Sequence, residues 1–215
     1  MDGETTEMAA SRADRYGFLA ALFLQEPDEQ TLPKQLQALN LAEQYAPSSL
    51  TALVSGISQE YYDCFFVPMS SKYTPPLESV FTGASGQGRG PLVGPATQET
   101  AKLYEETGFN PSDLLAFAPL KEMAMPDHVG FELAFMAYLC LQEEKSAERC
   151  DMDAVRRWTE WQFHFLSEHL TCWLPQLTEA LEKRQARFYA AAASLSAGWA
   201  EADLGELMTC SEGEV

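Results

Sequence analysis

The sequence predicts an all-α protein, and three observations support that class. Apolar residues recur every three or four positions along most of the chain, which is the spacing of a helix with one buried face. No stretch of useful length alternates apolar and polar residues as a half-buried strand does. Helix-breaking prolines and glycines gather chiefly at 67–95. We therefore expect a single bundle-like domain of about eight to ten helices with a long irregular loop.

The N-terminal helices follow from their apolar faces. A first helix, stopped by Pro27, carries one such face, formed by Tyr16, Leu19 and Phe23. A shorter helix is expected over 31–41. A long helix should start just after Pro47, because a proline followed by serines is typical of a helix start. Its stripe consists of Leu50, Leu53, Val54, Ile57, Tyr61, Cys64 and Phe65.

Two breaks in the helical pattern organise the chain. The first, 67–95, is too long and too rich in breakers for an ordinary connector, so it has a function or is mobile. Helical signal returns at Thr97 and ends near Thr107, where Gly108 suits a C-terminal cap. We interpret 111–125, the core of the second break, as a hinge. It would join an N-terminal helical half at 1–110, which includes the 67–95 loop, to a C-terminal half at 126–215.

The C-terminal half is helical throughout. One helix should follow His128, and another should begin near Asp151, where acidic residues face the positive end of the helix dipole. Pro175 should end or kink that second helix. The last strong helix has a stripe formed by Phe188, Ala192, Leu195 and Trp199.

The chain is strongly acidic. Its 215 residues contain 14 Lys and Arg against 32 Asp and Glu, a formal net charge of −18. Such a surface disfavours nucleic acid and anionic lipid and favours basic partners, although acidity also serves solubility alone. No apolar run approaches the length of a membrane span, and the first ten residues lack the basic, then apolar, pattern of an export signal. We therefore expect a cytoplasmic protein without a membrane span.

The sequence offers little for catalysis or metal binding. Five cysteines without a CxxC pair predict reduced thiols rather than a disulfide framework or zinc module. Three histidines are present, and no GxSxG elbow accompanies them. A helical metalloprotein or enzyme using His164, His169 and Cys172 is the alternative. It is weakened because five residues rotate the two histidines about 140° apart on a helix.

Pro126-Asp127-His128, followed by Glu132, is the first candidate site. Asp127 is well placed as the N-cap of the next helix, which would be a purely structural role. The alternative is functional, because a helix N-terminus carries unpaired donors and His128 can change charge near neutral pH. If Asp127 lies in the wall of a groove, it could bind a guanidinium.

An aromatic cluster at 61–68 is the second candidate. The helical stripe uses Tyr61, Cys64 and Phe65, which leaves Tyr62 and Phe66 four residues apart on a neighbouring face. Core packing explains each of these residues singly. An apolar patch for a partner explains the cluster equally well.

These motifs, taken in order, resemble the TorD/DmsD family of redox enzyme maturation proteins. The resemblance is carried by 61–66, by 75–81, by Pro126-Asp127-His128 with Glu132, and by 188–199. It implies an all-helical fold, no catalysis and no cofactor. It also implies a chaperone that binds the twin-arginine signal peptide of a molybdopterin oxidoreductase, and often its catalytic subunit, until cofactor insertion is complete. Domain-swapped dimers occur in the family, so a monomer or a swapped homodimer is expected, and the second break, at 110–125, would permit the swap.

The resemblance also assigns signal-peptide-binding residues. The Asp-His pair of the family motif matches Asp127 and His128, and the aromatic pair before the loop matches Phe65 and Phe66. The Pro-aromatic-x-Ser-Val segment begins here at Pro76 and includes Ser79, but Leu77 replaces the aromatic, so a stacking role is not carried over.

Residue chemistry and resemblance lead to one hypothesis. An apolar groove near Phe65, Phe66 and Leu77 would take the apolar centre of a leader, while Asp127 and Glu132 meet its arginines. The strong negative charge would steer the basic leader there. A general helical scaffold with another protein client remains the alternative.

Overall fold

The structure of the chain is a computed structural model that describes residues 2–45, 49–83 and 90–212. Within these ranges it contains eleven α-helices and no strand, which confirms the all-α prediction. Three helices, α3, α5 and α7, span six residues or fewer and are too short for sequence periodicity to reveal. None of the helices described is both long and apolar enough to cross a bilayer.

The helices have the following bounds. In chain order they are α1 Asp2–Leu24, α2 Leu32–Ala38, α3 Ala42–Tyr45, α4 Leu50–Phe65, α5 Glu78–Thr82, α6 Pro95–Thr107, α7 Ala118–Met123, α8 Val129–Glu148, α9 Met152–Phe165, α10 Thr171–Lys183 and α11 Arg187–Glu212. A 3₁₀ turn occupies Pro111–Asp113, and a π-helical turn at Leu166–Leu170 lies between α9 and α10.

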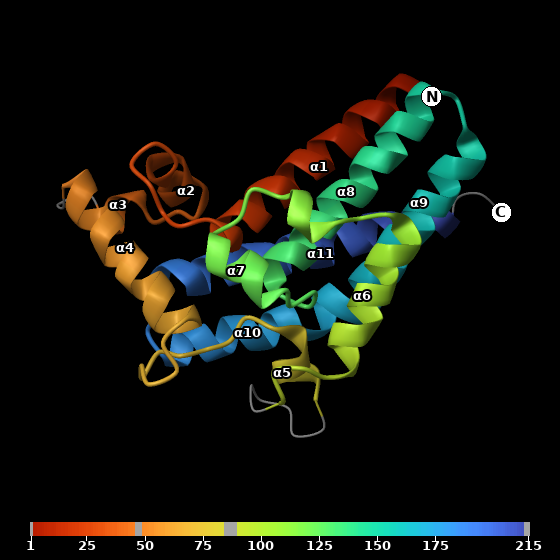
Figure 1. The fold of residues 1–215 in the computed structure, drawn as a ribbon. Coiled ribbons are helices and arrows are strands. Elements are labelled where there is room, and N and C mark those ends of the chain that lie inside the picture. The colour runs from red at the N-terminus through yellow and green to blue at the C-terminus, as the bar shows by residue number, and fades with distance from the viewer. Residues whose placement is uncertain (1, 46–48, 84–89, 213–215) are drawn as a thin grey trace.

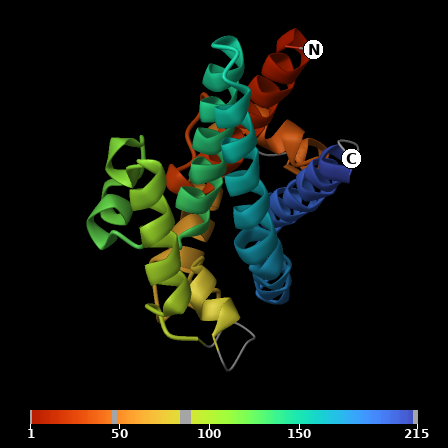
Figure 2. The same cartoon turned by 90° about the vertical axis from the view of Figure 1, so that its right-hand side faces the viewer.

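Helices α1 and α8 lie side by side and antiparallel at one end of the molecule (Figure 1). Their register is visible at both ends, because Arg12 contacts Glu143 while Leu24 lies against Gly130. A Cβ atom at Gly130 would lie 2.6 Å from the Leu24 side chain, so glycine is required for this close approach. Helix α9 packs back along α8, and α10 and α11 form a second antiparallel pair (Figures 1 and 2). The first helix and the C-terminal helices therefore share one core, while the proposed hinge at 111–125 stays a prediction.

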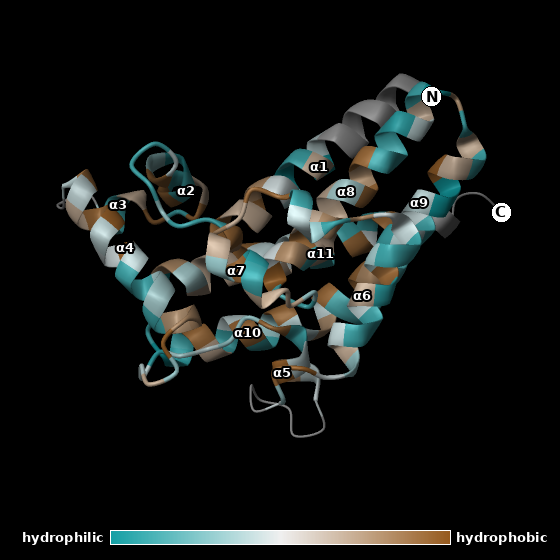
Figure 3. Cartoon of the chain, viewed as in Figure 1, coloured by the Kyte–Doolittle hydropathy of each residue, from teal (hydrophilic) through white to brown (hydrophobic). Residues whose placement is uncertain are grey.

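The outer helices show one polar and one apolar face. Apolar and hydrophilic residues alternate around them in Figure 3, as expected for helices packed on one side only. The centres of the predicted stripes of α1 and α4 are buried: Tyr16 and Phe23 of α1 and Tyr61 of α4 are all 0% exposed. Two predicted members are wrong, since Leu50 at the start of α4 and Leu195 of α11 are exposed. Periodicity therefore identified the core faces of these helices.

Several helix ends follow the sequence signals. Ser49 accepts a hydrogen bond from the Ala52 amide, and Asp151 accepts one from the Ala154 amide, so both are N-caps. Gly108 ends α6 with a φ of +79°, the left-handed conformation that glycine adopts without strain. Pro175 does not end its helix. It lies inside α10, a few residues after the wide π-helical turn.

A buried polar cluster, which sequence reasoning missed, joins four helices. We call it the Arg12 cluster; it comprises Arg12, Tyr16, Glu143, Gln162 and Asp203. The Arg12 guanidinium donates to Asp203 at 2.6 Å, to Glu143 at 3.2 Å and to Gln162 at 2.5 Å. Tyr16 donates to Asp203 at 2.7 Å. Since these residues come from α1, α8, α9 and α11, the cluster ties both ends of the chain together.

Candidate functional site

The structure brings two of the sequence motifs together at one corner. Leu77 and His128 form an isolated antiparallel β-bridge. On either side of it, the Glu78 amide donates to the Asp127 carbonyl and the Val129 amide donates to the Pro76 carbonyl, both at 2.9 Å. The stretch that precedes α5 is thus fastened to the start of α8, and we call this region the α5 corner (residues 76–82 and 126–132).

Asp127 has a different role from the one predicted. The N-cap of α8 is His128, whose Nδ1 accepts the Gly130 amide at 3.1 Å. Asp127 lies in the bridged stretch, so its carboxylate turns across to α5 and accepts the Ser79 amide at 3.0 Å. Burial lowers the pKa of His128 to about 3, which keeps the imidazole neutral and able to accept. The predicted cap is therefore wrong by one residue, because the Asp127 carboxylate accepts the Ser79 amide of α5 instead of an amide of α8.

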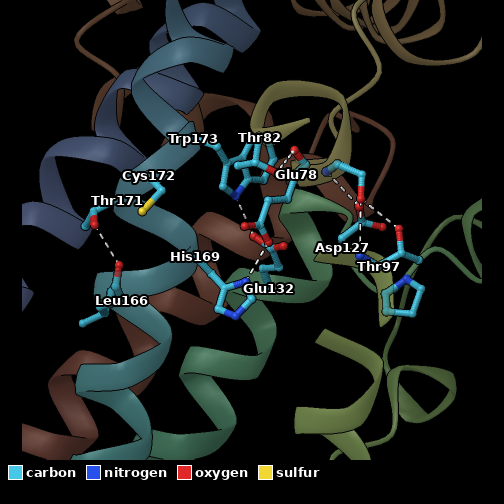
Figure 4. A network of polar contacts seen from close by, with 12 residues as sticks. Glu78, Thr82, Thr97, Asp127, Glu132, Leu166, His169, Thr171, Cys172 and Trp173 are labelled. Atoms are coloured by element: carbon cyan, nitrogen blue, oxygen red, sulfur yellow. Dashed lines mark hydrogen bonds and ion pairs between the residues drawn. The ribbon is translucent and has the colours of Figure 1, made fainter. Parts of the chain in front are cut away.

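Glu132 lies one turn into α8, in the core beneath α5. The Trp173 indole donates to its Oε2 at 2.9 Å, and beside it Glu78 Oε2 lies 2.8 Å from His169 Nδ1 (Figure 4). Burial raises the pKa of Glu132 well above its ordinary value, and the neighbouring carboxyls of Glu78 and Asp127 raise it further. This environment favours the neutral, protonated form of Glu132.

The α5 corner is closed. Asp127 and Glu132 are 0% exposed, and His128 is 2% exposed. Phe65, Pro76, Leu77 and Ser79 are buried as well, whereas Phe66 and Pro126 are partly exposed. The expected open cleft with an acidic rim is therefore absent from this conformation, in which no leader guanidinium can reach either carboxyl. The reason is that α5 folds over them and uses Asp127 as its own cap. A binding role for these nine residues stays a prediction.

The aromatic pair of the second candidate divides between core and surface. Phe65 packs against Tyr189 with ring centroids 4.8 Å apart, so the core interpretation holds for it. Phe66 packs edge-on against Phe117 at 5.3 Å, and Tyr62 contacts the same ring at 5.9 Å. Phe117 comes from the 110–125 segment, so this segment covers the face that sequence analysis left without a partner.

The residues of the metal-site alternative are separated. His164 is at the surface, 3.2 Å from Glu168, while His169 is buried against Glu78. Cys172 is exposed, and its thiol donates to the Ser167 carbonyl. Among the described residues, no group of three or more His, Cys, Asp or Glu side chains is arranged to hold a metal ion.

The structure reveals instead an open apolar hollow of about 380 Å³ between α1 and α8, which we call the α1–α8 groove. Its walls are mostly small or apolar side chains and the stretch after α6. They comprise Gly17, Ala20, Ala21, Leu24, Gln25, Gly108, Phe109, Asn110, Asp113, Leu114, Leu115, Ala134, Ala137, Tyr138 and Leu141. At its edge Leu115 is 81% exposed and Leu141 is 40% exposed.

Hydrogen bonds to backbone carbonyls hold the walls of this groove in place. The Phe117 amide donates to the Leu24 carbonyl at 2.7 Å, and the Tyr138 hydroxyl donates to the Thr107 carbonyl at 2.8 Å. Sequence reasoning missed the groove because alanines and glycines are ordinary helix residues. The signal that could have found it is the spacing of Gly17, Ala20 and Ala21, which places three small residues on one helix face.

A second hollow, of about 330 Å³, lies between α6 and the 110–125 segment, with Phe109 in the wall that it shares with the groove. Tyr104 and Phe131 line it, and so does Pro126, whose carbonyl accepts from the Tyr104 hydroxyl at 2.9 Å. Of the predicted site residues, Pro126 therefore lines this second hollow.

Comparison with known proteins now identifies the family. Residues 22–179 match the family described as "Nitrate reductase delta subunit", and this match covers well over half of the chain. The chain belongs to the nitrate reductase delta subunit family. Membership confirms the resemblance to redox enzyme maturation proteins, and the family is one of assembly proteins rather than enzymes. The match begins just after Ala21, so it includes the α5 corner and the α8 wall of the groove.

The chain is also similar to a selenate reductase assembly chaperone protein from Thauera selenatis. It is 41% identical over 58 residues, a stretch that covers 26% of this chain and 28% of the relative. No solved structure matches the chain.

Proposed function

We propose that this protein is a cytoplasmic assembly chaperone for a molybdoenzyme and that it holds the leader of the catalytic subunit in the α1–α8 groove. Family membership supports the chaperone role, and so does the similarity to an assembly chaperone of Thauera selenatis. The observation that carries the groove assignment is its form: a largely apolar trough, open to solvent, on a strongly acidic protein.

The groove suits the apolar centre of a leader. A Cβ atom at Gly17 would meet no heavy atom within 4 Å, so the groove is open beside this residue. With Ala20, Ala21, Ala134 and Ala137 as neighbours, there is room for the larger side chains of a bound segment. Burying a leucine-sized side chain contributes roughly 1.5–3 kcal/mol, so a few such contacts suffice for reversible binding.

Charge complements this apolar surface. Asp113 lines the groove, and exposed Asp14 lies one helical turn before Gly17. A leader that begins with arginines could place them near such carboxylates while its apolar part lies in the trough. The net charge of −18 would speed the encounter and make it sensitive to salt.

The residues predicted from the family resemblance retain a place in this proposal. Contact of Asp127, His128 or Glu132 with a leader requires the stretch before α5 to move away, because the α5 corner is closed. Phe66 and Pro126 could contact a leader without that movement, since both are partly exposed.

Calorimetric titration with a twin-arginine leader peptide tests the groove. Gly17→Leu should fill it and weaken binding at least about tenfold, the equivalent of one lost apolar contact. Gly56→Leu is the matched control, since Gly56 is also exposed within a helix and a Cβ there also meets nothing within 4 Å. Equal affinity of the Gly17→Leu and Gly56→Leu proteins would overturn the groove assignment. A peptide with both arginines changed to alanine separates the charge contribution from the apolar one.

A further inference from the structure

The buried acidic group beneath α5 is not used by the proposed groove. We propose that Glu78 and Glu132 share one proton and act as a latch: the shared proton holds α5 against α8 and α10, and its loss releases residues 74–82. The inference concerns the chain alone and does not rest on the proposed function.

The first support is that polar contacts attach α5, in addition to the buried side chains of Val80 and Phe81. A five-residue helix is not stable by itself, so its contacts hold it. Glu78 contacts His169, and the Ser79 amide donates to Asp127. The Ser79 hydroxyl lies 2.9 Å from that of Thr97. One large apolar contact is added by Phe81, which stacks on Trp173 with centroids 5.7 Å apart.

The second support is an imbalance of charge. Glu78 of α5, Glu132 of α8 and Asp127 bring three carboxyls together, and His169 of the π-helical turn contributes the imidazole that contacts Glu78 (Figure 4). Tyr104 of α6, Cys172 of α10 and neutral His128 are the other titratable neighbours among the described residues. In the part of the chain that the structure describes, neither Asp127 nor Glu132 has a lysine or arginine partner. Two ionised carboxylates side by side in a core repel strongly, and a shared proton removes that repulsion.

The third support is the hydrogen bonding of Glu132. Its Oε2 accepts from Trp173, but no N–H or O–H of the described residues donates to its buried Oε1. The carboxyl groups of Glu132 and Glu78 lie next to each other (Figure 4). Two carboxyls form a hydrogen bond only when one of them carries a proton, so the arrangement calls for a carboxylic acid next to a carboxylate.

The direction of the pH effect follows. Burial raises the pKa of Glu132 in the closed form above 4.5, the ordinary value that we expect in the released form. At a pH between the pKa of the released form and that of the closed form, the closed form holds a proton that the released form gives up. The closed form therefore weakens as pH rises through this window. Loss of one proton imposes a slope of roughly tenfold per pH unit on the ratio of closed to open α5.

Trp173 provides a local probe, because it donates to Glu132 and stacks on Phe81. We would label the tryptophans with 5-fluorotryptophan, assign Trp173 with Trp173→Phe, and record fluorine NMR spectra between about pH 5 and pH 8.5. The Trp173 signal should titrate in the wild-type chain and be independent of pH in Glu132→Gln, whose amide replaces the proton. Glu143→Gln is the matched control, since Glu143 is also a buried glutamate of α8 but is paired with Arg12. It should titrate at Trp173 like the wild type.

Hydrogen exchange at residues 74–82 measures release directly. After correction for intrinsic exchange, protection in the wild type should fall roughly tenfold per pH unit between pH 4.5 and the midpoint of the Trp173 titration, and level off above that midpoint. In Glu132→Gln, protection should stay constant. The latch would be refuted if neither the Trp173 signal nor the protection of residues 74–82 changed with pH in the wild type. It would also be refuted if Trp173 titrated in Glu132→Gln as it does in the wild type. No leader peptide is present in either measurement, so failure of the latch and failure of the groove are separate results.

Discussion

The Arg12 cluster and the α5 corner are both buried polar groups in one helical bundle, but their charges are balanced in different ways. In the Arg12 cluster a guanidinium lies between Asp203 and Glu143, with Gln162 and Tyr16 completing the hydrogen bonds. In the α5 corner, Asp127 and Glu132 have no lysine or arginine partner among the described residues, and balance depends on a proton. An arginine stays positively charged at every working pH, whereas a carboxyl group changes from neutral to negatively charged when it loses its proton. The first cluster is therefore suited to permanent attachment and the second to adjustable attachment.

The largest expected effect comes from removing the arginine. Arg12→Ala leaves Asp203 and Glu143 buried without their cation and should lower the free energy of unfolding by about 3–5 kcal/mol. Urea denaturation followed by circular dichroism measures this loss. Arg15→Ala is the control: Arg15 lies over the Trp199 ring on the exposed side of α1, so its removal should cost about 1 kcal/mol or less. Equal losses for the two variants would remove the contrast between the clusters.

A smaller loss of stability is expected from substitutions of Asp127, and these substitutions distinguish a structural role of the carboxylate from a role in leader binding. Asp127→Ala strips the buried Ser79 amide of its acceptor and should cost about 1–3 kcal/mol in the same denaturation experiment. Asp127→Asn keeps an acceptor oxygen and should cost less. If Asp127→Asn nevertheless binds a twin-arginine leader much more weakly than the wild type does, the carboxylate contacts the leader as the family resemblance predicts. Unchanged leader affinity would leave Asp127 with its role as a cap alone.

The smallest expected effect is a gain in stability whose size depends on pH. Glu132→Gln should raise the free energy of unfolding by about 1 kcal/mol near pH 8, because the amide supplies the hydrogen-bond donor without a proton. The gain should shrink toward pH 5, since a group with a raised folded pKa stabilises the fold at low pH and loses that contribution as pH rises. Thermal denaturation at several pH values compares the two proteins. A gain of the same size at every pH would mean that Glu132 is not titrating.

Sequence patterns predicted the long helices, because each buries one face and so repeats its apolar residues every three or four positions. The caps at Ser49, Asp151 and Gly108 were also predictable, since capping is a contact within a few residues. The short helices α5 and α7 were not, because each depends on contacts with residues far away in the chain, such as Ser79 with Asp127.

The candidate site was predictable only in part. The motifs around Pro76 and Asp127 were recognised one by one, and the structure joins them through a single β-bridge. Their burial was not foreseen, because whether a carboxyl lines a cleft or lies under a helix depends on where α5 folds. The α1–α8 groove escaped notice for the opposite reason: its small residues carry no chemical signature until α8 is laid against α1.

The sequence by itself therefore determined the class of fold, the faces that α1 and α4 bury and the excess of negative charge, since each is written in local spacing or composition. The ordered motifs indicated the family by resemblance. Tertiary structure alone decided that Arg12 meets Asp203, a residue 191 positions away, and that Glu78 meets Glu132 beneath a five-residue helix. The physical reason is that periodicity shows which side of a helix turns inward but not which helix it will meet. The energy of a buried charge depends on that neighbour.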